Sequence, residues 1–157
     1  METIATPSTS SLANEGWDRF VDTVQEANRE FARGVLGDAT RTVWSHDDDV
    51  TLFGGYGGLV EPGWKSVESR LTLAAQQSSK DGTYMSEEIK HAISGNFAYL
   101  LQVERYVFPG KPPIDFRVTI ICRLESDRWK IIHRHGDVIK MQQGPAHIHT
   151  MEIGLGQ

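Results

Sequence analysis

Four side chains able to hold or move a proton fall on consecutive predicted strands: Glu104, Arg117, His133 and His135. Imidazole has an unperturbed pKa of about 6.5, so a histidine exchanges protons efficiently near neutral pH. A carboxylate is an alternative base, and a guanidinium can hold an anionic group or a developing oxyanion. We therefore predict acid–base chemistry with His135 or Glu104 as the general base and Arg117 as the anion-holding group.

Five residues, His133 among them, are predicted to contact a substrate. Tyr56 lies in a run of glycines that permits sharp turns, and its hydroxyl or that of Thr119 would donate a hydrogen bond. Trp64, at a predicted helix start, would close the mouth of a pocket. Gln102 shares the even-numbered face of its strand with the proposed base, and His133 lies on the adjoining strand.

A predicted hairpin must position most of these groups. Residues 116–124 alternate between apolar and polar side chains, which is typical of a strand with one dry face. After a polar break, residues 128–138 alternate again and place four side chains on one face: Trp129, Ile131, His133 and His135. The sole cysteine, Cys122, lies on the dry face, so we expect a buried apolar residue and no intramolecular disulfide.

The pairing of the predicted strands decides which groups meet. The proline-rich turn at 109–113 is predicted to bring Glu104 opposite Thr119 and Tyr106 opposite Arg117. Glu104 and Arg117 would then be diagonal neighbours on one face. The alternative is that this face meets solvent or a second subunit, with a cross-strand salt bridge of about 0.2–1 kcal/mol. A shift by one residue would move every side chain to the opposite face.

The remaining elements follow from periodicity and turn residues. Apolar residues at steps of three and four predict an amphipathic helix over 17–35. The other predicted elements are a short helix after Asp38, a short strand at 50–53, a helix beginning near Pro62, and strands at 83–93 and 97–108. Helices grouped apart from an antiparallel meander indicate an α+β fold.

Other candidate sites are weaker. The carboxylates of residues 47–49 are adjacent and do not converge on one ion, so we expect a solvated turn. A metal site could be formed by two pairs of alternating histidines, His133 with His135 and His147 with His149. Nothing in the sequence fixes the distance between the two pairs, so this site is not expected. The glycine run 54–58 lacks the spacing of a phosphate-binding loop. We predict neither a metal nor a cofactor.

Length and composition bound the remaining possibilities. The chain has 157 residues, 39% of them hydrophobic, and a formal net charge of −5, without a basic cluster. These values predict one domain over 16–140, after a disordered lead-in at 1–15 and before a tail at 141–157. The acidic balance argues against nucleic-acid and anionic-membrane partners. No segment is typical of a signal peptide or a membrane span, so we expect a cytoplasmic protein.

Three stretches carry a family resemblance: RVTIICRLESDRWKIIHRHGD, WSHDDDVTLFGG and EPGWKSVESRL. Together with the order of elements, they resemble the nuclear-transport-factor-2-like superfamily over 17–138. The nearest groups are SnoaL-like and ketosteroid-isomerase-like proteins and the association domain of calmodulin-dependent kinase II. The most specific element is W-x-x-x-H-x-H, present as Trp129, His133 and His135.

The resemblance implies a cone-shaped α+β barrel of cystatin-like type, in which a strongly bent antiparallel sheet wraps three N-terminal helices around a pocket. It also implies a homodimer. Such proteins include cofactor-independent isomerases, cyclases and hydratases as well as non-catalytic assembly modules, and both classes stay open here. The base of ketosteroid isomerases has no counterpart at 52–55, and no acid stands at Thr119 or Ile120. Steroid isomerisation by their mechanism is therefore not expected.

Overall fold

Three helices precede most of a five-stranded sheet in the computed structural model, which describes residues 9–140 and their side chains from Asn14 onward. The elements in chain order are α1 (Thr9–Ala32), α2 (Asp38–Val43), β1 (Thr51–Phe53), α3 (Trp64–Ala75), β2 (Thr83–Ser94), β3 (Phe97–Val107), β4 (Ile114–Glu125) and β5 (Arg128–Val138). Within this part of the chain, no helix is both long and apolar enough to cross a membrane.

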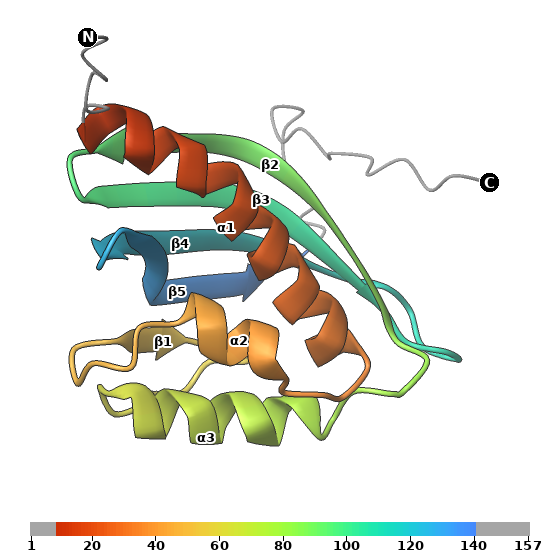
Figure 1. Ribbon diagram of the computed structural model, residues 1–157. Helices are drawn as coiled ribbons and strands as arrows, with labels where there is room; N and C mark the ends of the chain where they lie inside the picture. Colours follow the sequence, from red (N-terminus) through yellow and green to blue (C-terminus); the bar gives the residue numbers. More distant parts are fainter. Residues whose placement is uncertain (1–8, 141–157) are drawn as a thin grey trace, which may run out of the picture.

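The sheet has the order β1-β5-β4-β3-β2. Strands β2 to β5 form the expected antiparallel meander, and β1 adds to β5 in parallel. In Figure 1, α1 crosses the concave face of the bent sheet diagonally, whereas α2 and α3 lie beside the β1 edge. The predicted α+β class and helix-on-sheet architecture are confirmed, although the sheet is open and not a closed barrel.

Helix α1 owes its position to one apolar face. Trp17, Phe20, Val24 and Ala27 are spaced by three and four residues, and all four are buried in the core beneath the sheet. The helix begins at Thr9, whereas the sequence predicted a lead-in up to residue 15. Residues 1–8 and the tail 141–157, with His147 and His149, lie outside the described residues.

The predicted register between β3 and β4 is wrong. Glu104 pairs with Phe116, and Tyr106 pairs with Ile114, so Arg117 lies opposite Val103. Glu104 was predicted to lie opposite Thr119, so the observed pairing is displaced by three residues, an odd number. Because the side-chain direction alternates along a strand, this shift places Arg117 on the face opposite to Glu104.

Strand β5 contains a bulge that the alternating pattern concealed. Cys122 pairs with Ile131, whereas the preceding residue of β4, Ile121, pairs with His133, so Ile132 is the extra residue on β5. Before the bulge, β5 directs Trp129 towards the helices. After the bulge, the even-numbered side chains of β5 face the helices in place of the odd-numbered ones. The histidines of β5 therefore lie on the outer face of the sheet.

Candidate functional site

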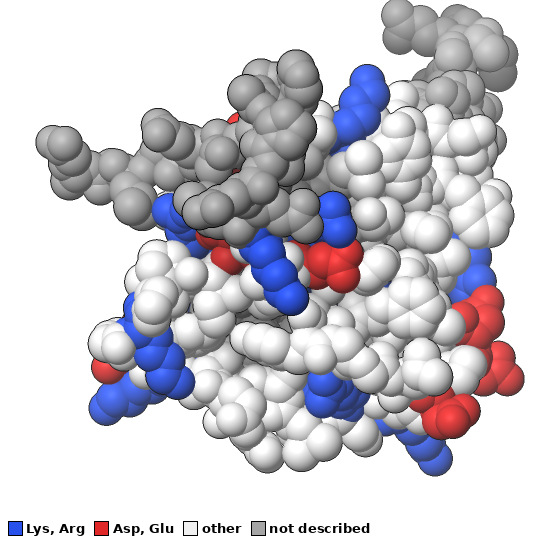
Figure 2. All heavy atoms as spheres, turned by 180° about the vertical axis from the view of Figure 1, so that it is seen from behind, with Lys and Arg blue, Asp and Glu red and all other residues white. Residues whose placement is uncertain are grey.

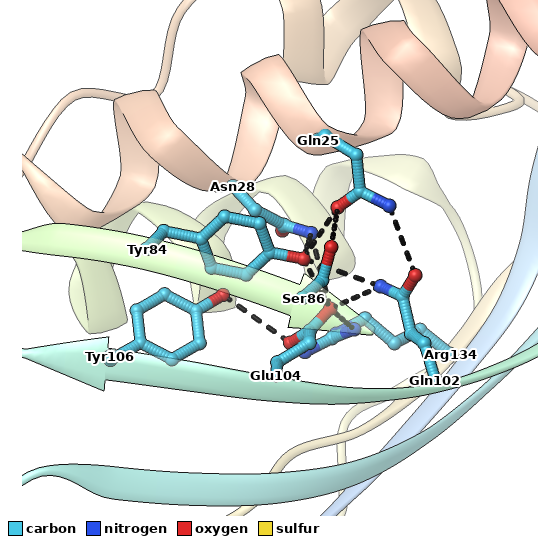
Figure 3. Close-up of polar contacts among 8 residues, drawn as sticks. All are labelled: Gln25, Asn28, Tyr84, Ser86, Gln102, Glu104, Tyr106 and Arg134. Carbon is cyan, nitrogen blue, oxygen red and sulfur yellow. Dashed lines mark hydrogen bonds and ion pairs between the residues drawn. The ribbon is translucent and has the colours of Figure 1, made fainter. Parts of the chain in front are cut away.

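A buried carboxylate lies at the centre of the concave face. Glu104 of β3 has no exposed surface and accepts six hydrogen bonds from side chains of α1, β2, β3 and β5. The donors, drawn in Figure 3, are Asn28, Tyr84, Gln102, Tyr106 and, twice, Arg134. These hydrogen bonds offset the loss of hydration that a buried carboxylate suffers.

Arg134 of β5 is the charged partner of this carboxylate. Its Nη1 donates to Glu104 Oε1 over 3.0 Å and its Nη2 to Oε2 over 2.7 Å, which is a bidentate ion pair. Burial disfavours the guanidinium charge, but the attraction of Glu104 outweighs it and raises the pKa of Arg134 above its usual value. The arginine is therefore positively charged at neutral pH, and 17% of its side chain remains exposed.

Two tyrosines complete the polar cluster. Burial, followed by the charge of Glu104, raises the pKa of both Tyr84 and Tyr106 well above the usual value for a phenol. Both hydroxyls are therefore neutral hydrogen-bonding groups. The single hydroxyl proton of Tyr84 is shared between Gln25 Oε1 of α1, at 2.6 Å, and Glu104 Oε1, at 3.3 Å, so the cluster connects the helix with the sheet.

A cavity of about 430 Å³ opens beside this cluster. It lies between α3, the loop after β1 and the concave face of the sheet. Its lining is largely aromatic and aliphatic and comprises Phe31, Leu52, Phe53, Gly54, Gly55, Tyr56, Arg70, Leu71, Leu73, Ala74, Gln77, Ser78, Tyr106, Phe108, Ile114, Phe116, Arg134 and Gly136. This volume is within the range of pockets that hold small organic ligands.

Aromatic rings determine the shape of the cavity wall. Tyr106 makes edge contacts with Phe116 and Phe31, with ring centroids 5.8 and 6.0 Å apart, and stacks on Phe108 at 6.3 Å. Gly55 passes so close to this wall that a Cβ there would lie 2.2 Å from the ring of Phe116. The loop after β1 therefore approaches the wall only because glycine occupies this position.

Of the predicted site residues, three lie near the cavity or its cluster. Glu104 and Gln102 belong to the buried cluster, where Gln102 donates to Glu104 over 2.7 Å. Tyr56 lines the mouth of the cavity, is 74% exposed and contacts Phe116 edge-on. Glu104 and Tyr56 therefore lie in this region, but Glu104 pairs with Arg134 and not with Arg117, the predicted partner.

Four other predicted residues lie on the outer face of the sheet. Arg117 is 73% exposed and pairs with Asp137, which also contacts His135. Thr119 is the cross-strand neighbour of His135. His133 contacts Thr51 Oγ1 over 2.6 Å, and partial burial, followed by the neighbouring histidine, lowers its pKa. The structure does not bring these residues together with Glu104, and their roles in catalysis or binding stay predictions.

Trp64 and the aspartate run lie away from the cavity. The ring of Trp64 stacks on His46 with centroids 4.5 Å apart, and it is not among the residues that line the cavity. Asp47 and Asp49 both pair with Arg123, over 3.0 and 2.7 Å. These two ion pairs therefore hold the loop before β1 against strand β4 of the sheet.

The sequence analysis missed the cationic residues of the cavity. The predicted alternation of β5 placed the histidines on the face of Trp129, and Arg134 was not considered because the bulge in β5 was not foreseen. Arg70 was not singled out either. One available signal was the polar pair Gln25 and Asn28 within the apolar face of α1, because buried amides require polar partners on the facing sheet.

Solved structures of similar shape were found, whereas neither a protein-family model nor a curated protein matches the sequence. A putative calcium/calmodulin-dependent protein kinase type II association domain from Thiobacillus denitrificans is 14% identical, with a TM-score of 0.67 over 78% of this chain and 94% of that one. A nuclear transport factor 2-like superfamily protein from Salmonella enterica is 16% identical, with a TM-score of 0.63 over 89% of this chain and 100% of that one. An uncharacterised cystatin-like protein from Caulobacter vibrioides is 15% identical, with a TM-score of 0.63 over 82% and 91%.

Proposed function

We propose that this protein, which has the NTF2-like, cystatin-like fold, binds a small organic molecule in the cavity between α3 and the sheet. The observation that carries the proposal is an aromatic-lined cavity of about 430 Å³ next to a hydrogen-bonded Glu104–Arg134 pair. Most of the lining is apolar, which favours an apolar ligand body, and few polar groups are available to orient it. The fixed hydrogen-bond network behind the wall would hold this shape without a ligand.

The same geometry favours binding over proton transfer by the predicted bases. Among the described residues that line the cavity there is neither a histidine nor a carboxylate. Glu104 is engaged by its six donors and lies behind the cavity wall. The hydroxyls that line the cavity belong to Tyr56, Ser78 and Tyr106, and a raised pKa makes Tyr106 a hydrogen-bond donor and not a base.

Filling the cavity tests this function. Ala74 of α3 lines the cavity, so Ala74→Trp should occupy part of it and abolish ligand binding. Wild type and variant would be screened by thermal shift against aromatic acids, polyketide-like aromatics, steroids and epoxides. A ligand at a hundred times its dissociation constant stabilises the wild type by about 2.7 kcal/mol, and the variant should show no shift.

The matched control is Thr72→Trp on the same helix. Thr72 is exposed and is not part of the cavity lining, so this variant introduces the same ring outside the site. It should retain every shift seen with the wild type. If no compound binds the wild type, or if Ala74→Trp binds as tightly as Thr72→Trp, the proposed function is wrong.

A second candidate function is self-association through the outer face of the sheet. One cross-strand row on this face runs from Thr51 through His133, Ile121 and Tyr99 to Ala92. Ile121 and Tyr99 are each 38% exposed, and uncharged side chains cover much of the view in Figure 2. A row of uncharged side chains with exposed Ile121 and Tyr99 at its centre favours an interface with a second copy of the chain.

Changing the centre of this row should alter the oligomeric state. Ile121→Glu would place a charge in the middle of the interface and is expected to convert a dimer to a monomer in size-exclusion chromatography with light scattering. Val35→Glu is the control, because Val35 is an exposed apolar residue that follows α1. A wild type that is monomeric at every concentration would exclude this second function.

A further inference from the structure

We infer that the ligand of this cavity is an organic anion whose acidic group is held by Arg70. The inference rests on the proposed binding function and adds the charge of the ligand to it. Arg70 is a half-buried residue of α3 that lines the cavity. Its guanidinium is the only charge on the lining that has no counterion among the described residues.

The two arginines of the lining differ in their partners. Arg134 is neutralised by the bidentate contact with Glu104, and six hydrogen bonds fix that carboxylate. Arg70 makes neither a hydrogen bond nor an ion pair with the described residues, and Glu68, a carboxylate of the same helix α3, pairs instead with Arg41 of α2. A guanidinium beside a low-dielectric cavity without a counterion favours binding of an anion.

Arg70 also lies beside the loop after β1, which forms part of the cavity lining. A Cβ built on Gly54 would be 3.8 Å from Nη2 and 4.0 Å from Nε of Arg70, so the guanidinium borders the loop after β1. That loop carries the exposed Tyr56. The charge therefore lies beside the loop, and the aromatic wall formed around Tyr106 lies further along the lining. An amphipathic ligand would place its rings on this wall and its acidic group at Arg70.

The positive charge of the cavity lining contrasts with the negative net charge of the chain. The protein has a formal net charge of −5, yet both charged residues of the lining are arginines. A planar carboxylate matches the donor geometry of a guanidinium and can accept two parallel hydrogen bonds. An ammonium-bearing ligand would instead meet like charge at the entrance, so cations should be excluded.

A matched pair of ligands tests the inference. The affinity of 2-naphthoate and its neutral analogue 2-naphthamide would be measured by isothermal titration calorimetry with the wild type and with Arg70→Gln. The naphthoate should bind the wild type about tenfold more tightly than the amide, and this advantage should vanish in Arg70→Gln. Lys65→Gln removes the same charge from an exposed position of α3 outside the lining and should change neither affinity.

Three further measurements separate the possible outcomes. The preference for naphthoate should decrease as the salt concentration rises, because the charged contact is partly exposed. 2-Naphthyl phosphate in the same assay would show which acidic group fits better, and loss of its binding in Arg70→Gln would support the inference equally. Melting temperatures of the unliganded variants would verify that both are folded.

Two results would overturn the inference in distinguishable ways. If amide and naphthoate bind the wild type and Arg70→Gln with equal affinity, and Ala74→Trp still abolishes both, the anion inference fails while the proposed function stands. If no acid or amide of the series binds, and the wider screen with the Ala74→Trp control is also negative, both fail together. Equal losses in Arg70→Gln and Lys65→Gln would assign the effect to net charge and not to a contact at Arg70.

Discussion

Glu104→Gln is expected to destabilise the protein by about 3 kcal/mol, because it leaves Arg134 without its counterion. Losses on breaking buried ion pairs are about 3–5 kcal/mol, and the lower end applies here because Arg134 is 17% exposed at the cavity. The new amide would also direct its own N–H donors at Arg134, Tyr106 or Asn28, all of which donate to this position. Urea unfolding monitored by tryptophan fluorescence measures the effect.

A second ion pair of similar geometry provides the control. Arg105 and Asp115 also form a bidentate pair, with contacts of 2.7 and 2.8 Å, but their side chains are 16% and 29% exposed. Asp115→Asn should cost about 1 kcal/mol or less, because water can replace the lost contact. Equal losses of unfolding free energy in Glu104→Gln and Asp115→Asn would show that the burial of Glu104 does not add to the cost of breaking its ion pair.

The double variant Glu104→Leu/Arg134→Met separates the cost of an unpaired charge from that of lost packing. Removing both charges should recover most of the stability lost in Glu104→Gln, since apolar residues often replace a buried ion pair without net loss. The remaining donors, Asn28 and Tyr106, would lose an acceptor, so recovery should be incomplete. A double variant less stable than Glu104→Gln would contradict this account.

The sequence predicted the elements well because their signals are local. The apolar spacing of α1 and the alternation within β4 and β5 depend only on neighbouring residues, and the observed β5, Arg128–Val138, has the predicted bounds. Polar breaks and glycines marked most of the turns. The helix α1 was placed too late because residues 9–15 lack apolar side chains at the required spacing, although they are largely helical in the structure.

The site was less predictable because it depends on the parity of strand pairing. An odd shift between β3 and β4 moved Arg117 and Thr119 to the outer face, and the bulge in β5 exchanged His135 for Arg134 on the inner face. Neither event changes the apolar alternation of a single strand. The face of β3 on which Glu104 lies was judged from β3 alone, so the error in strand pairing did not affect it.

These two errors have a common consequence for function. The predicted imidazoles lie on the outer face of the sheet, whereas the concave face holds a guanidinium and two tyrosines that all hydrogen-bond to the carboxylate of Glu104. Such a network is rigid, and its groups are occupied by their partners. Rigidity favours a preformed cavity, and it is consistent with the proposal that a ligand's charge would be recognised by Arg70, which has no counterion among the described residues, and not by Arg134.

Gly82→Ala is expected to destabilise the protein by about 3 kcal/mol, because a single methyl group would collide with the backbone of α1. The Cβ would lie 1.9 Å from the carbonyl oxygen of Ala32 and 2.9 Å from the ring of Phe108. Ala32 is fully buried at the end of α1, so the helix itself would have to move. Phe31 and Phe108 both line the cavity, and the variant should therefore also weaken binding of any cavity ligand.

Gly16→Ala is the same glycine-to-alanine change, but it is expected to raise the stability of the protein and not to lower it. Gly16 is an exposed residue within α1, and a Cβ there would approach only Trp129, at an ordinary 3.9 Å. Alanine reduces the conformational entropy lost on helix formation, so this variant should be more stable by about 0.5–1 kcal/mol. Urea midpoints of both variants would show whether close approach of α1 to the start of β2 sets the position of the helix. Gly82→Ala with wild-type stability would mean that α1 moves freely, and the fixed cavity wall inferred from Phe31 and Phe108 would lose its basis.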